Sequence, residues 1–203
     1  MELKTTAGIP SWRLSLVAGL GNPGSAYAHT RHNAGFMVAD ILASEFGIGF
    51  DKQKFDITFG RGRIDRIPVV LAKPQAFMNR SGPPLRKLVD FFKIPSEAVL
   101  VIHDDIDLAF GRLKIKEKGG HGGHNGIRSL IDAFGTDNFV RLRIGVGRSG
   151  NNMSVSDHVL SKFTAQENES LAQIIAMARD AVVTVVCEGT KAGMNQFNQK
   201  RSL

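Results

Sequence analysis

Residues 14–35 read LSLVAGLGNPGSAYAHTRHNAG, and the interpretation of the whole chain starts from them. The run from Leu14 to Leu20 is short, apolar and rich in glycine at its end, which is typical of a buried strand that feeds a tight loop. The segment that follows, FMVADILASEFG, has apolar residues at roughly helical spacing and predicts a helix over residues 36–46 that stops at Gly47. A strand, a loop and a helix in this order indicate an α/β fold.

Similar segments recur further along the chain. Strands are predicted around residues 55–64, 67–74, 99–103, 111–118 and 139–147, and helices over residues 81–92, 126–134 and 166–187. We expect Ser81 to cap the first of these helices, and the last one to be helical despite its valine-rich part. The chain is therefore predicted to be a single-domain three-layer α/β sandwich over residues 1–203, in which helices flank a mixed, largely parallel central sheet. Residues 1–13 are read as an N-terminal extension.

Composition narrows the possible partners. The chain has 203 residues, and its 26 basic against 19 acidic residues give a net charge of +7, which favours nucleic acid over an anionic membrane or a phosphorylated metabolite. Its one cysteine, Cys187, forms no internal disulfide, and no secretory signal is visible. No apolar stretch looks long enough to span a bilayer. We therefore expect a cytoplasmic protein that has no membrane partner.

Four polar clusters come directly after predicted strands. They are GNPGSAYAHTRHN (residues 21–33), QAFMNRSG (75–82), HDDIDL (103–108) and KGGHGGHNG (118–126). In α/β folds, ligands bind at the carboxyl ends of the strands. We therefore expect the four clusters to meet in one cleft.

Three glycines in the first cluster resemble a dinucleotide fingerprint. Gly19, Gly21 and Gly24 spell G-x-G-x-x-G, but that motif needs a helix that begins at the glycines and an acidic residue at the end of a second strand. Pro23 and the following loop do not suit such a helix, and Asp40 falls inside the predicted helix. The glycines are therefore expected to shape a turn, and a nucleotide-dependent oxidoreductase is the distant alternative.

His32 is the candidate general base, because a neutral imidazole accepts a proton near neutral pH. It would be an ordinary surface histidine unless a carboxylate orients it, and Asp104, directly after the 99–103 strand, is the expected partner. Asp105 and Asp107 compete for this role. With His103, the three acids would also suit a metal site, but we do not expect one, because no second acidic cluster is present.

The glycine-rich cluster has two possible roles beyond a flexible connector. His121 and His124 lie three residues apart, but no cysteine or acid beside them completes a zinc site. Successive main-chain N–H groups of the glycines would suit an anion nest, and Lys114, Lys116 and Lys118 precede it. We therefore expect phosphate contact here, and the phosphate would belong to RNA.

Three asparagines follow predicted strands: Asn22, Asn79 and Asn125. An amide side chain both donates and accepts, as needed to bind a peptide or to stabilise an oxyanion, although each residue would also suit a turn. No G-x-S-x-G motif occurs, and Cys187 lies on an apolar helical stripe, so covalent catalysis has no support. Water activated by a histidine is the chemistry that remains.

Five motifs in sequence order resemble those of bacterial peptidyl-tRNA hydrolases: LVAGLGNPGSAYAHTRHNAGF, FMNRSG, HDDIDL, GGHGGHNG and FVRLRIGVGR. The resemblance covers nearly the whole chain from Leu14 onward. It implies an enzyme that hydrolyses the ester between a peptide and the 3′ ribose of tRNA and so recycles tRNA. It also implies a cytosolic monomer that needs no metal and no cofactor.

The resemblance assigns roles by matching position. His32 would be the general base, Asp104 would stabilise its productive form, and Asn22 would help to distinguish peptidyl from aminoacyl substrates. Asn79 and Asn125 would hold the substrate near the ester. The remaining matches are substrate contacts: Tyr27 and Phe77 at the tRNA end, Met78 in the cleft, and Lys114, Lys116 and Arg143 at tRNA phosphates.

The departures from the family pattern are modest. Asp105 replaces a common glutamate, Lys118 replaces a glycine, and Ser149 stands where proline is frequent. Glycine and asparagine suggest that the segment 149–162 is mobile, and they indicate nothing further about its role. A non-catalytic RNA-binding protein on the same fold is the main alternative, and the presence of the candidate catalytic residues argues against it.

Overall fold

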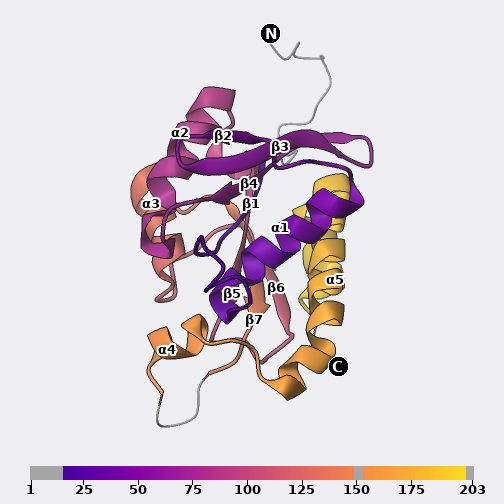
Figure 1. Ribbon diagram of the computed structural model, residues 1–203. Coiled ribbons are helices and arrows are strands. Elements are labelled where there is room, and N and C mark those ends of the chain that lie inside the picture. The colour runs from indigo at the N-terminus through magenta and orange to yellow at the C-terminus, as the bar shows by residue number, and fades with distance from the viewer. Residues whose placement is uncertain (1–15, 149–152, 200–203) are drawn as a thin grey trace.

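The computed structural model of the protein describes residues 16–148 and 153–199. Within these ranges, seven strands form one sheet in the order β2-β3-β4-β1-β5-β7-β6 (Figure 1). The strands are β1 (Leu16–Gly19), β2 (Lys52–Lys54), β3 (Ile57–Ile64), β4 (Ile67–Pro74), β5 (Val99–Asp105), β6 (Leu113–Lys116) and β7 (Val140–Gly145). Residues 1–13, the expected extension, lie outside the described residues.

The centre of the sheet is parallel and its margins are antiparallel. Strands β4, β1, β5 and β7 run parallel to one another, whereas β2 and β3 at one edge and β6 at the other pair antiparallel with their neighbours. The expected mixed sheet is therefore confirmed, but "largely parallel" describes only its centre. Strand β1 is buried throughout, because helices cover both faces of the parallel centre.

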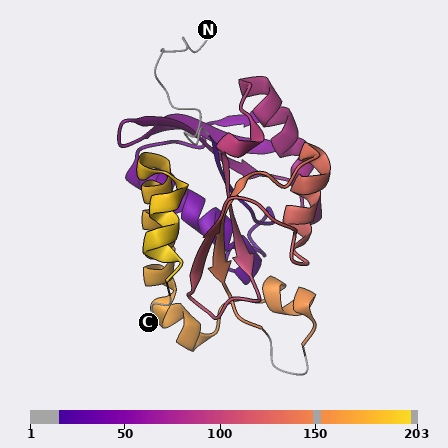
Figure 2. The same ribbon diagram turned by 180° about the vertical axis from the view of Figure 1, so that it is seen from behind.

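Helices cover both faces of the sheet, so the predicted three-layer sandwich is confirmed (Figures 1 and 2). One face packs against α2 (Gly82–Phe92) and α3 (Asn125–Phe134), and the other packs against α1 (Ala34–Glu45), α5 (Ala165–Glu188) and α6 (Thr190–Phe197). Short 3-10 turns, η1 (Arg31–Asn33), η2 (Met78–Arg80) and η3 (Ser96–Ala98), precede α1, α2 and β5. The helix α4 (Val155–Leu160) lies near the carboxyl ends of β5 and β7.

Helix α5 is the one described helix that is long and apolar enough to cross a membrane, by length and composition alone. The expectation that no stretch meets this test is therefore wrong for residues 165–188. In the structure its buried residues, among them Ile174, Ala178 and Val182, belong to the core beside the sheet. Its helical form agrees with the periodic pattern, because core packing favours the helix over the strand tendency of its valines.

Three local features differ from the expectations. Strand β2 was not predicted, because it has no apolar residue and no strand pattern. Helix α4 was not predicted either, and it falls in the segment 149–162 that was expected to be mobile. Of that segment, residues 149–152 lie outside the described residues. Ser81 stands at the N-cap position of α2, but its hydroxyl donates to the carbonyl oxygen of Met78 instead of capping the helix.

The glycine at the end of β1 allows α1 to pack closely on the sheet, and a later glycine shapes the turn that follows. A Cβ atom at Gly19 would lie 2.3 Å from the carbonyl oxygen of Gly35, so a larger residue does not fit there. Gly24 has φ of +100°, a conformation that favours glycine. Since α1 begins only at Ala34, no helix opens at the glycine motif, and the turn interpretation holds.

Candidate active site

A cleft of about 710 Å³ opens at the carboxyl end of the parallel strands. Residues from all four polar clusters line it, as expected, and α4 adds a fifth segment. The lining includes Asn22, Tyr27, His32, Phe77, Met78, Asn79, Asp104, Asp105, His124, Asn125, Val155, Val159 and Leu160. The cleft therefore brings together every candidate catalytic residue and most of the candidate substrate contacts.

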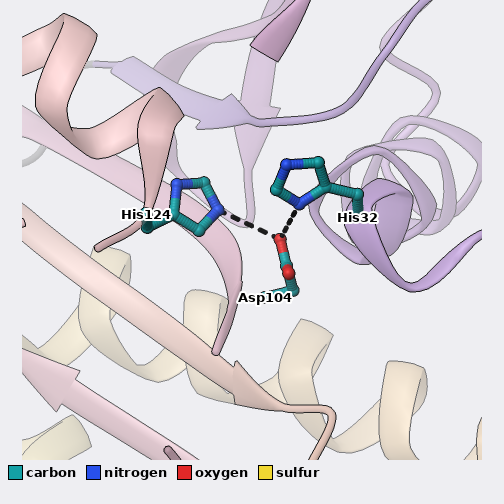
Figure 3. A group of neighbouring side chains, drawn as sticks. All are labelled: His32, Asp104 and His124. Carbon is teal, nitrogen blue, oxygen red and sulfur yellow. Dashed lines mark hydrogen bonds and ion pairs between the residues drawn. The ribbon is translucent and has the colours of Figure 1, made fainter. Parts of the chain in front are cut away.

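His32 and Asp104 form a buried pair at the base of the cleft. Asp104 lies near the end of β5, between β1 and β7, and its side chain is 1% exposed. His32 lies in η1, and its Nδ1–H donates to Oδ1 of Asp104 over 2.8 Å (Figure 3). Because Nδ1 carries the proton in this bond, Nε2 of the neutral ring has a free lone pair. His32 thus has the tautomer that a general base requires.

His124 is a second donor to the same carboxylate, a role that is not predicted from the sequence. Its Nε2–H donates to Oδ1 of Asp104 over 3.0 Å (Figure 3). Its Nδ1 accepts from the main-chain N–H groups of Gly126 and Ile127, over 3.1 and 3.2 Å. These two donors at the start of α3 fix the tautomer of His124. The predicted helix begins at residue 126, so the sequence does not indicate an N-cap at His124, and only the observed start of α3 at Asn125 gives it that position.

The two histidines keep Asp104 ionised. Burial alone would raise its pKa, but electrostatic attraction to His32 and His124 and the hydrogen bonds from both rings outweigh this effect and hold the pKa far below the ordinary value of 3.8. His103 behaves in the opposite way, because burial and the nearby His124 lower its pKa well below 6.5. The carboxylate is therefore charged and His103 is neutral at neutral pH.

His103 supports the cluster by packing. Its ring meets that of His124 edge to face, with centroids 4.6 Å apart, and its Nδ1–H donates to the carbonyl oxygen of Asp104 over 2.7 Å. Among the described residues, its buried Nε2 has no hydrogen-bond partner. A neutral ring in this place fills space beside His124 without adding charge.

His32, Asp104 and His124 are also the one group of described residues whose geometry would suit a metal ion, with ligand atoms within 4.8 Å of one another. An ion would need a lone pair on Nε2 of His124, but that atom carries a proton because Nδ1 accepts from the start of α3. Metal binding at Nε2 would therefore break the hydrogen bonds that Nδ1 of His124 accepts from Gly126 and Ile127. The cluster, as arranged, is better suited to hold and transfer protons.

The other acidic residues of the HDDIDL cluster are engaged by arginines. Asp105 pairs with Nε of Arg143, and Asp107 pairs with Arg148 over 2.5 Å. Among the described residues, Asp104 is the acid of this cluster that is hydrogen-bonded to His32.

Asn22 is held by the loops on both sides of the cleft. Its Oδ1 accepts from the main-chain N–H of Met78 over 2.8 Å. Its main-chain N–H and carbonyl bond the side chain of Asn33, over 2.8 and 3.0 Å. Because the carboxamide oxygen is used, the NH₂ group is the part of Asn22 that can reach a substrate. Asn33, which the sequence analysis passed over, fixes this loop beside His32.

Aromatic and amide side chains surround the catalytic pair. The rings of Tyr27 and Phe77 meet edge to face with centroids 6.3 Å apart, and Phe77 is 55% exposed. Asn79 and Asn125 are exposed and line both this cleft and a hollow of about 600 Å³ between α2 and α3. These groups would be accessible to a large ligand.

The candidate phosphate contacts lie beside the cleft, not in its lining. Lys114 and Lys116 lie on the edge strand β6, and Lys114 is opposite Arg143 of β7. Arg143 reaches the cleft only through its ion pair with Asp105. We call Lys114, Lys116 and Arg143 the cationic strip.

Four N–H groups at the end of the glycine-rich loop do not belong to the expected anion nest, because they donate within the protein. Those of Gly123 and His124 donate to His121, and those of Gly126 and Ile127 donate to His124. These four groups are therefore already engaged within the loop and at the start of α3.

Comparisons of the sequence and of the structure with known proteins find the same family. A protein-family model described as peptidyl-tRNA hydrolase matches residues 16–203. The chain is 45% identical to a peptidyl-tRNA hydrolase of Clostridium novyi over 183 residues, which cover 90% of this chain and 97% of that protein. It is 46% identical to a chloroplastic peptidyl-tRNA hydrolase of Arabidopsis thaliana, over 93% of this chain and 66% of that protein. A crystal structure of peptidyl-tRNA hydrolase from Acinetobacter baumannii superposes with a TM-score of 0.87 at 42% identity, over 93% of this chain and 96% of that one.

Proposed function

The chain belongs to the peptidyl-tRNA hydrolase family, and we propose that His32 is the general base with which it hydrolyses the ester between the peptide and the 3′ ribose of peptidyl-tRNA. The products are free tRNA and free peptide. The observation that carries the assignment of His32 is its hydrogen bond to Asp104, which leaves Nε2 unprotonated in a cleft lined by amide and aromatic side chains.

The reaction needs two proton transfers. Nε2 of His32 takes a proton from a water molecule, whose oxygen attacks the carbonyl carbon of the ester and forms a tetrahedral oxyanion. When the C–O bond to the ribose breaks, the protonated His32 returns its proton to the departing 3′ oxygen. The ionised Asp104 stabilises the imidazolium that exists between these steps.

His124 acts through Asp104. Its N–H bond to Oδ1 fixes the carboxylate, and its own tautomer is fixed by the start of α3. Because both histidines donate to the same oxygen, any rotation of Asp104 would break both bonds. His124 is therefore a positioning residue for the catalytic pair.

The asparagines hold the acyl part of the substrate. The NH₂ groups of Asn22, Asn79 and Asn125 are suitable donors for the oxyanion and for peptide carbonyl groups. We assign to Asn22 the recognition of the peptide bond that distinguishes peptidyl from aminoacyl substrates. Its fixed carboxamide oxygen, bonded to Met78, supports this role because the NH₂ group is then directed by the fold.

The tRNA part of the substrate lies on the other groups of the cleft. Tyr27 and Phe77 would contact the terminal nucleoside, since aromatic rings that line a cleft can stack on bases. The cationic strip would bind tRNA phosphates. The net charge of +7 supports this assignment.

We place the protein in the cytoplasm, as a single-domain monomer that needs no metal, cofactor or membrane. Among residues 16–148 and 153–199, the one apolar helix of sufficient length, α5, packs in the core, and Nε2 of His124 carries the ring proton where an ion would need a lone pair. An RNA-binding protein without activity is less well supported, because the catalytic cluster is fully assembled.

The test compares an N-blocked aminoacyl-tRNA with its unblocked counterpart, with and without a chelator. We expect release of tRNA from the blocked substrate only, at a rate that the chelator does not change. Binding of both substrates without release would support the RNA-binding alternative, and loss of activity with the chelator would contradict a metal-free reaction.

A further inference from the structure

Arg141 is a buried arginine that the proposed mechanism does not use. It lies in β7 and is 3% exposed. Its neighbours along the strand, Val140 and Leu142, belong to the core beside α1 and α5. Because successive side chains of a strand point to opposite faces, Arg141 lies on the face that α2 and α3 cover. A buried guanidinium is costly unless its donors are satisfied, so its partners indicate what it does.

The guanidinium holds the two loops that flank α3. Its NH1 group donates to the carbonyl oxygen of Gly120 over 2.8 Å, in the glycine-rich loop before the helix. Its NH2 group donates to the carbonyl oxygen of Asp137 over 3.2 Å, in the loop after the helix. Helix α3 runs between these two points. One side chain of the sheet therefore fixes both connections of α3.

An aromatic ring holds the guanidinium itself. The central carbon of the guanidinium lies 4.5 Å from the centroid of the Phe139 ring. That ring is fully buried and packs edge to face on Phe134, the last residue of α3. A planar guanidinium that lies over a ring and donates to two carbonyl groups has little freedom to move. Arg141 is therefore a rigid point of attachment for the loops.

The cost of this arrangement argues against a role in stability alone. In the part of the chain that the structure describes, the buried Nε of Arg141 has no acceptor. Burial also lowers the pKa of the guanidinium, because desolvation disfavours its charge. An apolar side chain of similar size would avoid both costs. It would not, however, hold two carbonyl groups at a fixed spacing, as a guanidinium does.

A tight turn connects Gly120 to His124. The main-chain N–H of His124 donates to the carbonyl oxygen of His121 over 3.0 Å, and the two glycines between them have φ of +55° and +81°. Positive φ at both central residues is typical of a type I′ turn. The N–H of Gly123 adds a bond of 3.0 Å to Nδ1 of His121. The position of Gly120 is thus transmitted to His124 through a turn that its own hydrogen bonds fix.

His124 lies at the end of this turn, and its Nε2 is 3.0 Å from Oδ1 of Asp104. A shift of the loop would lengthen this bond. We propose that Arg141 is a positioning residue for the active site, which fixes the glycine-rich loop so that His124 donates to Asp104. Its effect on catalysis passes through His124. The proposal rests on the proposed function, since it assigns a further residue to the same reaction.

The test is a double-mutant cycle of Arg141→Lys and His124→Asn in the full chain. Lysine keeps the charge, but its ammonium group is a point charge that does not span both carbonyl groups. The rate of ester cleavage is measured in a single turnover with saturating enzyme and an N-blocked aminoacyl-tRNA. We expect Arg141→Lys to slow cleavage about fivefold in the otherwise wild-type protein and less than about twofold in His124→Asn. An arginine that only supports the fold would slow both backgrounds by the same factor.

NMR of the histidine side chains reads the position of His124 without activity. A ring N–H that is hydrogen-bonded to a buried carboxylate exchanges slowly with water and gives a resonance at low field. The resonance of His124 is the one that His124→Asn lacks. We expect Arg141→Lys to shift this resonance and to leave that of His32 in place.

Arg86→Lys is the matched control. Arg86 lies on α2 and donates to the carbonyl oxygen of Phe134 over 3.4 Å, so it also contacts α3, but at the C-terminal end. This variant should keep the wild-type rate and the wild-type His124 resonance.

Gly122→Ala carries the test if Arg141→Lys does not fold. A Cβ atom there would meet nothing within 4 Å, but φ of +55° is strained for alanine, so the change disturbs the turn itself. It should shift the His124 resonance, and it should slow cleavage in the wild-type background but not in His124→Asn.

Three results would overturn the proposal. They are cleavage by Arg141→Lys at the wild-type rate, an equal slowing in both backgrounds, and an unchanged His124 resonance. Failure of the proposed function is a different result: the protein would not cleave the ester, or would cleave it without His32, and the NMR comparison would still report whether Arg141 positions His124.

Discussion

The catalytic cluster and the cationic strip differ in how the fold holds them. His32, Asp104 and His124 lie at the base of the cleft, and each is bonded to another member of the cluster. Lys114 and Lys116 project from an edge strand, and Lys116 is exposed. Chemistry therefore depends on positions that the core fixes, whereas RNA binding depends on charges that solvent screens. A change in the first region should alter kcat, and a change in the second should alter KM and its salt dependence.

Among the changes predicted to alter kcat or KM selectively, Asp104→Asn should have the largest effect, and it should act on kcat. The change removes the charge that stabilises the protonated His32 and weakens control of its tautomer, so we expect kcat to fall about 10²- to 10⁴-fold. Binding of tRNA, measured by filter retention, should change little. Asp107→Asn is the control, since Asp107 is exposed and pairs with Arg148. Nearly normal kcat in Asp104→Asn would place the base elsewhere.

A second experiment separates the two roles of His124. In His124→Asn the new side chain can still cap α3, because asparagine is a favoured N-cap residue, but it has no N–H group placed to reach Asp104. We expect kcat to fall roughly tenfold, the loss of one hydrogen bond to a charged group, with little change in Tm. His124→Ala should lose the cap as well and cost about 1 kcal/mol of stability.

The outcome that counts against this role is an equal kcat in His124→Asn and the wild type. It would mean that His32 alone holds Asp104 and that His124 serves only as a helix cap.

Replacing Lys114 and Lys116 by alanine should affect binding alone. We expect KM to rise and the slope of log affinity against log salt to decrease by about one to two units, while kcat at saturation stays normal. Replacing Lys87 and Lys93, two exposed lysines on and after α2, removes the same charge and is the control. An unchanged slope in the first variant, or an equal change in both, would show that tRNA phosphates lie elsewhere.

The smallest expected effect is on stability at low pH. Burial and the nearby His124 hold the pKa of His103 below its unfolded value near 6.5, so below that pH the unfolded chain binds the additional proton. The contribution of His103 to the free energy of unfolding is therefore complete above about pH 6.5 and is lost as the pH falls. Asp104 adds a similar loss below about pH 3.9.

Urea unfolding between pH 7 and pH 5 measures this effect. His103→Gln, which does not titrate, should flatten the pH dependence in that range. An equally steep dependence in the variant would assign the loss to other groups.

The elements that the sequence predicted are those with their own apolar pattern. The valine-rich part of α5 was assigned correctly, because its apolar residues follow a helical period over many turns. Strand β2 was missed because Lys52, Gln53 and Lys54 carry no such pattern and are ordered only by pairing with β3. Helix α4 was missed because it is short, and Ser154, whose side chain caps it, lies in a polar stretch.

The site residues likewise divide into those that the sequence pattern predicts and those whose roles depend on the folded structure. His32 and Asp104 could be paired in advance, since each follows a predicted strand of a parallel sheet and their residue types suit each other. The role of His124 depends on where α3 starts in space, which spacing in a glycine-rich loop does not reveal. Arg141 lies in a predicted strand, and its bonds to Gly120 and Asp137 require the folded chain.

The most direct test of the account is the single-turnover rate of ester cleavage in wild type and His32→Ala, with enzyme in excess over an N-blocked aminoacyl-tRNA and with binding measured in the same samples. We expect His32→Ala to bind the substrate as the wild type does and to cleave it about 10²- to 10⁴-fold more slowly. Cleavage at a nearly normal rate by the bound His32→Ala variant would contradict it.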